Sequence, residues 1–260
     1  MKKIAVDGTE YEIEGILFDK DGTLIKLDVL WSSWFDELWE KITNVNPSTK
    51  LTKGSIAKSV GLDLTNRSIS TKGPLAIGTL EDITIILSFH LYCDGIPWND
   101  AVSIVRKSIE DIHRTIDWES SLQLICQLEP FLKRAKAEGI KLSVVTSDDT
   151  DIAKLHLQLL KIDHYFDSII GSEDVSRPKP FPDIGIQACE EMGINTNTVI
   201  VIGDTNADMN LGKNLQAKAS IGIVHENKDS GDYLTSANHI INHYGQIAVV
   251  PNRKKMIEIK

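Results

Sequence analysis

The amino-acid sequence predicts an α/β protein whose parallel sheet, with its connecting helices, is interrupted by one helical insert. After about residue 120, short apolar runs alternate with helical stretches at lengths suited to right-handed crossovers. Between residues 27 and 120, apolar residues recur at helical spacing without convincing strand alternation. We therefore assign residues 1–26 and 121–260 to the core and residues 27–120 to a separate helical domain.

The chain begins with a predicted β-hairpin. Residues 3–6 and 9–18 flank Asp7-Gly8, a dipeptide typical of two-residue hairpin turns. The second strand leads into the apolar residues 16–18. This stretch indicates a short buried strand, the first of the predicted parallel sheet.

The insert contains at least three predicted helices. One includes residues 31–42, a second follows the capping-box-like sequence that starts at Thr79, and a third opens at Pro97. The segment 45–78 is rich in Lys, Ser, Thr, Gly and Asn and is predicted to consist mainly of loops. The domain is accordingly expected to be all-helical.

The second part of the core alternates strands and helices. The predicted strands cover about residues 141–146, 168–171, 199–203 and 219–223. The predicted helices cover residues 130–138, 151–160 and 182–192, and two of them end at a glycine.

Composition and charge exclude several classes of function. The net charge of −9 gives no overall attraction to nucleic acid or anionic membranes. We find no apolar run near the length of a membrane span and no secretory signal, so we expect a soluble, cytoplasmic protein. The three cysteines are far apart and lack C-x-x-C spacing, which disfavours a disulfide framework or a thiolate metal site.

The run I-L-F-D-K-D-G-T-L at residues 16–24 places two carboxylates, Asp19 and Asp21, where the first core strand ends. Gly22 supplies the turn that ends the strand. Open α/β sheets bind ligands at the carboxyl edge of their strands. Both acids are therefore candidates for phosphoryl chemistry.

Three further signals follow in order along the chain. An apolar run ends in Thr146-Ser147, Lys179 lies between two prolines, and residues 199–202 run into Gly-Asp-Thr-Asn-Ala-Asp at residues 203–208. Together with Asp19 and Asp21, this set resembles the four motifs of the haloacid dehalogenase-like (HAD) superfamily. The resemblance implies a Rossmann-like core, and the position of the insert implies a C1 cap. The sequence around the first motif and at residues 73–79 looks like that of proteins called phosphoglycolate phosphatases.

The residue types fit hydrolysis of a phosphomonoester. A carboxylate is ionised at neutral pH, so Asp19 is the expected nucleophile and would form an aspartyl-phosphate. Asp21 would protonate the leaving alcohol and later deprotonate the attacking water. The resemblance implies that magnesium binds to Asp19, to the backbone carbonyl of Asp21 and to Asp204, with Asp208 as a ligand or as support for a metal-bound water.

Phosphate-binding groups are expected at two other motifs. Lys179, restricted by its flanking prolines, would hold Asp19 and the phosphoryl oxygens together. The Thr146 hydroxyl and the Ser147 backbone N–H would complete a small anion site. The family often has Asn after this threonine, whereas Ser147-Asp148 follows here, and Asp148 adds negative charge close to the expected phosphate.

Other readings of these motifs are weaker. Gly22 stands at the fourth position from Asp19, whereas an EF-hand loop needs glycine at the sixth. His239 and His243 are four residues apart, but such a pair without a glutamate is more often surface or packing. Asp21 argues against phosphorus–carbon cleavage, despite a lysine in the insert, and against dehalogenation.

Our function hypothesis is a magnesium-dependent phosphatase of a small phosphomonoester, with phosphoglycolate as the first candidate and a phosphosugar as another. Lys53, Arg67 and Lys72 of the insert are candidate contacts for a substrate carboxylate. One alternative is a phosphosugar mutase of the β-phosphoglucomutase type. Another is a non-catalytic regulatory protein that binds a phosphometabolite. The expected partner is a small phosphorylated metabolite, and the sequence leaves monomer and homodimer open.

Overall fold

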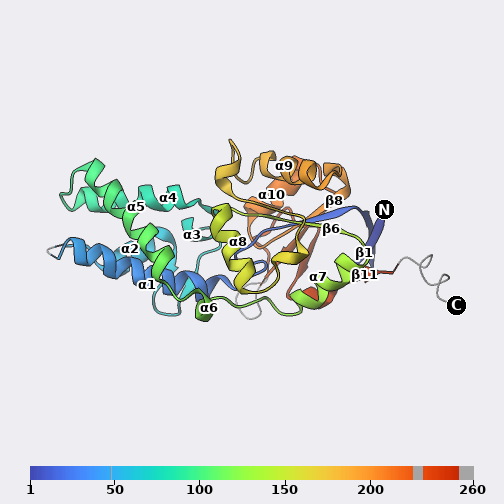
Figure 1. Cartoon of the computed structure of the whole chain (residues 1–260), viewed down its shortest axis with the longest axis horizontal. Coiled ribbons are helices and arrows are strands. Elements are labelled where there is room, and N and C mark those ends of the chain that lie inside the picture. Colours follow the sequence, from blue (N-terminus) through green and yellow to red (C-terminus); the bar gives the residue numbers. More distant parts are fainter. Residues whose placement is uncertain (48, 225–230, 252–260) are drawn as a thin grey trace. The chain divides into compact units, whose positions relative to one another are not determined.

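The computed structural model describes residues 1–47, 49–224 and 231–251 and divides the chain into two compact units (Figure 1). The core unit comprises residues 1–25 and the chain from residue 124 onward, and the helical unit comprises residues 26–123. Residues 26 and 121–123, which the sequence assigned to the core, belong to the helical unit. The Lys26 N–H donates a 2.8 Å hydrogen bond to the Gln123 carbonyl, which joins the two ends of the helical unit.

The core unit contains the predicted parallel sheet. Its six strands lie in the order β10-β9-β8-β3-β6-β7, and every neighbouring pair is parallel. The strands are β3 (Gly15–Phe18), β6 (Lys141–Val145), β7 (Ser168–Ile170), β8 (Val199–Gly203), β9 (Ala219–Ile223) and β10 (His239–Ile241). The Rossmann-like α/β fold class is confirmed. The edge strand β10 was not predicted, because it contains only two adjacent apolar residues.

The register of the central strands brings the motif residues together. Phe18 at the end of β3 lies opposite Val144 of β6 and Ile202 of β8. The residues that follow these strands therefore emerge at one edge of the sheet. The Asp19 N–H continues the ladder with a 2.9 Å hydrogen bond to the Ile202 carbonyl.

Helices cover both faces of the sheet, as Figure 1 shows. On one face, Leu17 and Val145 pack against α9 (Asp183–Met192) and α10 (Asn206–Leu215). On the other face, Phe18 packs edge-on against Phe131 of α7 (Leu128–Ala137). Helix α8 (Thr150–Leu159) also belongs to the core unit. The predicted positions of α7, α8 and α9 agree with the structure to within two residues.

A second, antiparallel sheet contains the predicted hairpin. Strand β1 (Lys2–Val6) pairs with β2 (Thr9–Ile13), and Asp7 and Gly8 both have positive φ, as the predicted turn requires. Strand β2 ends at Ile13, so β3 belongs to a different sheet instead of continuing it. A strand that was not predicted, β11 (Ile247–Val250), pairs with β1.

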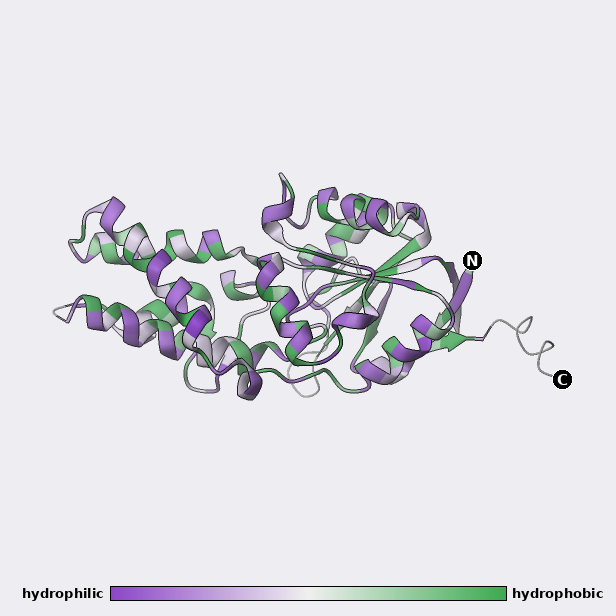
Figure 2. Cartoon of the chain, viewed as in Figure 1, coloured by the Kyte–Doolittle hydropathy of each residue, from purple (hydrophilic) through white to green (hydrophobic). Residues whose placement is uncertain are grey.

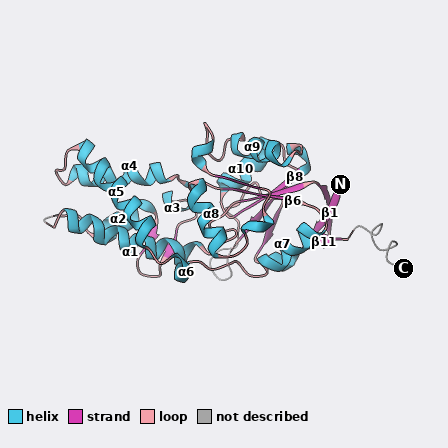
Figure 3. Cartoon of the chain, in the orientation of Figure 1, coloured by secondary structure: helices cyan, strands magenta, loops and turns pink. Residues whose placement is uncertain are grey.

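The helical unit contains three long helices, drawn in cyan in Figure 3: α1 (Leu27–Val45), α4 (Leu80–Cys93) and α5 (Trp98–Thr115). Hydrophobic and hydrophilic residues alternate along these helices (Figure 2), as amphipathic packing requires. Thr79 caps α4 as predicted, because its hydroxyl accepts a hydrogen bond from the Asp82 N–H. Shorter helices are α3 (Pro74–Ile77) and α6 (Trp118–Ser121).

Two details of the helical unit correct the prediction. Residues 53–60 form α2 (Lys53–Val60), which starts at a Thr52 capping box and ends at Gly61 with φ 87°, so segment 45–78 is not mainly loop. Strands β4 (Leu62–Asp63) and β5 (Ser68–Ile69) form a short hairpin, so the unit is not all-helical. None of the helices among the described residues has both the length and the apolarity that crossing a bilayer requires.

The packing of α7 predicts a strong dependence of core stability on Phe131. Its ring is buried and stacks on Tyr244 with 5.3 Å between centroids. We expect Phe131→Ala to lower the free energy of unfolding of the core by about 3–5 kcal/mol. Phe89→Ala in α4 is the control, since Phe89 is 56% exposed, and it should change stability by less than about 0.5 kcal/mol.

Urea denaturation followed by far-UV circular dichroism would measure both variants. All five tryptophans lie in the helical unit, so tryptophan fluorescence follows that unit separately. Equal unfolding midpoints for Phe131→Ala and the unmodified protein would contradict this account of the core.

Candidate active site

The loop after β3 is organised around one backbone carbonyl. The Lys20 carbonyl accepts hydrogen bonds from the N–H groups of Thr23, Leu24 and Ile25, at 3.3, 2.8 and 3.1 Å. Gly22 in this loop has φ 82°, and a Cβ at this position would overlap the Asp204 carboxylate. Glycine is therefore required here both by the backbone conformation and by the close approach of Asp204.

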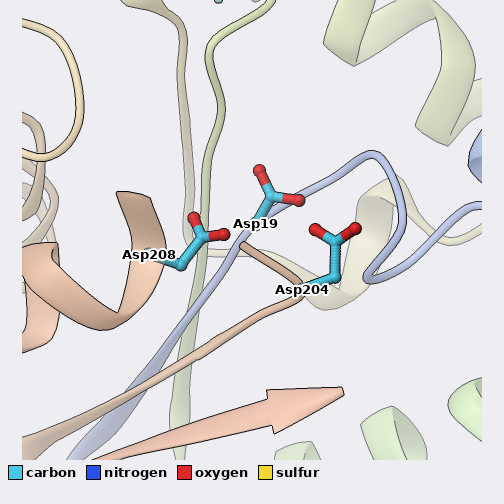
Figure 4. Close-up of side chains that lie close together, drawn as sticks. All are labelled: Asp19, Asp204 and Asp208. Carbon is cyan, nitrogen blue, oxygen red and sulfur yellow. The ribbon is translucent and has the colours of Figure 1, made fainter. Parts of the chain in front are cut away.

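Three carboxylates converge beside this loop, as Figure 4 shows. Asp19 follows β3, Asp204 follows β8, and Asp208 lies in the first turn of α10. One oxygen of each lies within 4.8 Å of the others, and all three side chains are buried. The sequence analysis expected Asp19, Asp204 and Asp208 at one site, and the structure places these three carboxylates together.

Lys179 ties two of these acids together. Its Nζ lies 2.5 Å from Asp19 Oδ1 and 2.7 Å from Asp208 Oδ1. Burial opposes the charge on the Lys179 ammonium, but Asp19 and Asp208 outweigh this effect, so its pKa is raised. The lysine is thus held as a cation next to the expected nucleophile.

Asp208 is fixed at the start of α10 and is only 1% exposed. Its Oδ2 accepts hydrogen bonds from the Thr205 N–H at 3.1 Å and from the Thr205 hydroxyl at 2.6 Å. Its other oxygen bonds to Lys179. Because both oxygens are engaged, Asp208 is better arranged to support the cluster than to serve as a direct metal ligand.

Asp204 is the acid whose surroundings suit a cation best. Its Oδ1 is buried and has no hydrogen-bond partner among the described residues. Burial, together with Asp19 and Asp208, raises the pKa of Asp204 well above its ordinary value. Burial also raises the pKa of Asp19 to about 7, against the lowering effect of Lys179. A hard divalent cation prefers carboxylate oxygens and would offset the repulsion, so these residues fit a magnesium ion.

Thr146 and Ser147 occupy the turn after β6. The Thr146 N–H donates to the Ile170 carbonyl at 3.0 Å, and its Oγ1 accepts a 3.1 Å hydrogen bond from the Asp148 N–H. Ser147 is half-buried next to it. The roles of Thr146 and Ser147 in holding phosphate stay predictions.

The charge of Asp148 is compensated. Its Oδ2 lies 3.2 Å from Lys20 Nζ, and its Oδ1 accepts a 2.9 Å hydrogen bond from the Asp149 N–H. Sequence reasoning treated Asp148 as uncompensated charge near the phosphate and missed Lys20 altogether. Its position in the sequence, between Asp19 and Asp21 at the end of a buried strand, could have indicated that Lys20 pairs with acids of the site.

The three cationic candidates of the helical unit differ in their surroundings. Lys53 and Arg67 each form a 2.8 Å ion pair with Asp36 of α1. Lys72 is exposed and forms no ion pair with any residue that the structure describes. Whether these cations contact a substrate stays a prediction.

Both histidines of the weak H-x-x-x-H pattern have other partners. His239 in β10 bonds to the Tyr11 hydroxyl at 2.8 Å and to Asp7 at 3.2 Å. His243 accepts a 3.1 Å hydrogen bond from the Gly245 N–H in a short 3₁₀ turn. These contacts agree with a packing role, as the sequence analysis favoured.

Comparison with known proteins settles the family. The sequence model of the haloacid dehalogenase-like hydrolases matches residues 16–221, most of the chain. The chain belongs to this family. The resemblance inferred from the four motifs is therefore confirmed, and the chain is similar to members named as phosphatases.

Two bacterial relatives illustrate the similarity. A provisionally named pyrophosphatase, PpaX, of Caldanaerobacter subterraneus is 40% identical over 198 residues, which cover 76% of each chain. The phosphoglycolate phosphatase of Escherichia coli K12 is 31% identical over 120 residues, which cover 46% of this chain and 47% of that enzyme.

Solved structures agree on the fold. A predicted phosphoglycolate phosphatase from Haemophilus somnus superposes with a TM-score of 0.68 at 17% identity, over 89% of this chain and 95% of that one. A provisionally named β-phosphoglucomutase from Thermotoga maritima gives 0.61 at 18% identity, over 88% and 94% of the two chains.

The buried acids predict that stability depends on pH and on metal. The pKa of Asp19 in the folded protein, about 7, exceeds its ordinary value of 3.8, so protonation of Asp19 favours folding. This contribution is fully present below the ordinary value and is lost as the pH rises through about 7. Without a divalent cation, we expect the melting temperature to fall over this range. Magnesium favours the ionised acids, so it should raise the melting temperature more at about pH 8 than at about pH 5.

Differential scanning fluorimetry with magnesium or a chelator would measure these shifts. Asp204→Asn should remove most of the magnesium-induced shift. Asp183→Asn alters a surface carboxylate that bonds to Arg177, and it should retain the shift. A magnesium shift of equal size in both variants would exclude Asp204 from the metal site.

Proposed function

We propose that this chain is a magnesium-dependent phosphatase that hydrolyses a small phosphomonoester through an aspartyl-phosphate on Asp19. The observation that carries the proposal is the contact of Lys179 with both Asp19 and Asp208, at 2.5 and 2.7 Å, beside an Asp204 oxygen that has no hydrogen-bond partner among the described residues. This arrangement combines a nucleophile, a fixed cation and a set of oxygen ligands at one edge of the sheet.

In the first step, an Asp19 oxygen attacks phosphorus and the bond from phosphorus to the ester oxygen breaks. The Asp21 carboxyl group gives its proton to the leaving oxygen, which departs as an alcohol. Burial raises the pKa of Asp21 despite the nearby Lys20, which favours the protonated form that this step needs. Lys179 offsets the charge on the phosphoryl oxygens.

In the second step, the Asp21 carboxylate takes a proton from water. The resulting hydroxide attacks phosphorus, and the bond between phosphorus and the Asp19 oxygen breaks. Inorganic phosphate leaves, and both acids return to their starting protonation states. The Thr146 hydroxyl and the Ser147 N–H would hold phosphoryl oxygens through both steps.

Asp19, the Asp21 backbone carbonyl and Asp204 would hold magnesium, with Asp208 in support. Bound magnesium would supply charge neutralisation for the phosphoryl group. Asp204 is suited to this role because its buried Oδ1 has no other partner among the described residues.

The names of two relatives suggest which substrates to test first. Phosphoglycolate is our first candidate, because the E. coli relative is named as its phosphatase. Inorganic pyrophosphate is a phosphoanhydride and lies outside the proposed ester class, but it belongs in the test because the C. subterraneus relative is provisionally named a pyrophosphatase. Phosphosugars belong to the same test. A mutase would need a bisphosphate activator, which makes that alternative distinguishable.

Phosphate release from these compounds, with and without magnesium, tests the proposal. We expect magnesium-dependent release from at least one small ester and its loss in Asp19→Asn. The order of kcat/KM values would identify the substrate class. Turnover that requires a sugar bisphosphate would favour the mutase, and a folded, magnesium-bound protein that releases no phosphate would favour regulatory binding.

The cations of the helical unit predict a separate effect on substrate affinity. If Lys53 contacts a substrate carboxylate, Lys53→Ala should raise the KM for phosphoglycolate by up to about 5-fold, the scale of one partly exposed ion pair. The KM for a phosphate ester without a carboxylate should hardly change. Lys58→Ala, an exposed lysine on the same helix, is the control. Equal KM values for all three proteins would remove Lys53 from the substrate site.

A further inference from the structure

Lys20 is a fully buried lysine between the expected nucleophile and the expected general acid. Its Nζ lies 2.6 Å from Asp21 Oδ1, so the ammonium donates a short, charge-assisted hydrogen bond to this acid. Among the described residues, no other side chain hydrogen-bonds to the Asp21 carboxyl group. The position of this group therefore depends on Lys20.

Two groups from other elements hold the ammonium. Asp148, in the turn after β6, approaches Lys20 Nζ at 3.2 Å. His156 Nδ1, in α8, lies 3.1 Å from the same nitrogen. Both side chains are themselves buried. Asp21, Asp148 and His156 thus surround the ammonium.

The backbone of Lys20 is fixed as well. Its carbonyl accepts the hydrogen bonds that fold the loop over residues 20–25. The Lys20 backbone is held by the loop, and its ammonium is held by Asp148 and His156. The side chain therefore loses little further conformational entropy when it bonds to Asp21. The lysine can therefore define where one oxygen of Asp21 lies, and the geometry of the carboxyl group then defines the other.

We propose that Lys20, held by Asp148 and His156, is a positioning residue that fixes the Asp21 carboxyl group for proton transfer to the leaving oxygen. The inference rests on the proposed function, in which Asp21 is the general acid. One Asp21 oxygen is committed to Lys20, and the other is left for the ester oxygen. Asp148 then helps to hold the Lys20 ammonium in place, and Lys20 compensates its charge.

A simpler role for Lys20 would be to neutralise the buried Asp148 charge. The two roles differ in a double variant. Lys20→Met/Asp148→Asn removes the charges of Lys20 and Asp148 together, so Asp148 no longer stands as a carboxylate without its cation, but the variant does not restore the bond to Asp21. If neutralisation is the only role, the double variant recovers activity. If positioning is the role, the defect remains.

The readout is the dependence of kcat/KM on the leaving group, because kcat/KM reports the steps up to the first irreversible one. An alkyl ester needs a proton on its leaving oxygen, whereas p-nitrophenyl phosphate hardly does. We expect Lys20→Met and the double variant to lose about 100-fold or more on the best alkyl ester of the panel, the scale of general acid catalysis. On p-nitrophenyl phosphate, we expect less than about a 10-fold loss.

Lys141→Met is the matched control. Lys141 lies at the other end of β6 and forms an ion pair with Asp167 at 3.2 Å. Its replacement should leave both kcat/KM values unchanged. Circular dichroism and the magnesium-induced shift in melting temperature would show that each variant is folded.

Each outcome decides a different question. A selective loss on the alkyl ester in both Lys20 variants supports the inference. An equal loss on both esters, no loss, or full recovery in the double variant overturns it while leaving the phosphatase proposal intact. If the unmodified protein hydrolyses neither ester, the proposed function fails, and this inference fails with it.

Discussion

Repulsion among carboxylates gathered at one edge of a sheet is the constraint on which this site depends. The strands end in register, so their acids must lie close together, away from most of the solvent. An unpaired buried charge is costly, and a cluster of like charges costs more. Only two buried lysines lie among these acids in the part of the chain that is described. The acids are Asp19, Asp21, Asp148, Asp204 and Asp208, and the lysines are Lys20 and Lys179.

The two lysines divide the cluster between them. Lys179 pairs with Asp19, the proposed nucleophile, and with Asp208, whereas Lys20 pairs with Asp21, the acid proposed to transfer protons. Asp204 has a contact with neither ammonium, and one of its buried oxygens has no hydrogen-bond partner in the described chain. This oxygen is where a metal would do most to stabilise the ionised site. The way the chain distributes its own cations thus supports the proposed magnesium site independently of the family.

Local sequence patterns made the central strands and the acids at their ends predictable. Apolar strands that end in acids predict which residues meet at the sheet edge, because strand direction and parallel pairing fix that edge. Pairings between distant side chains could not be predicted in the same way. Lys20 meets His156 across 136 positions of sequence, and no periodicity reports such a contact. Helix α2 was missed for another reason: its polar composition resembles a loop, and its stability depends on a cap and on packing.

The helical unit shows why substrate choice is harder to read than chemistry. Sequence reasoning can identify Lys53 and Arg67 as cations, but it cannot show that Asp36, on another helix, pairs with both. Two cations share one carboxylate there, so the group keeps a net positive charge and suits an anion. A substrate carboxylate would have to compete with Asp36 for the same donors, at positions that are partly exposed, where ion pairs are weak. Selectivity from this source would therefore be modest, and the proposed mechanism places the well-ordered contacts at the buried core site instead.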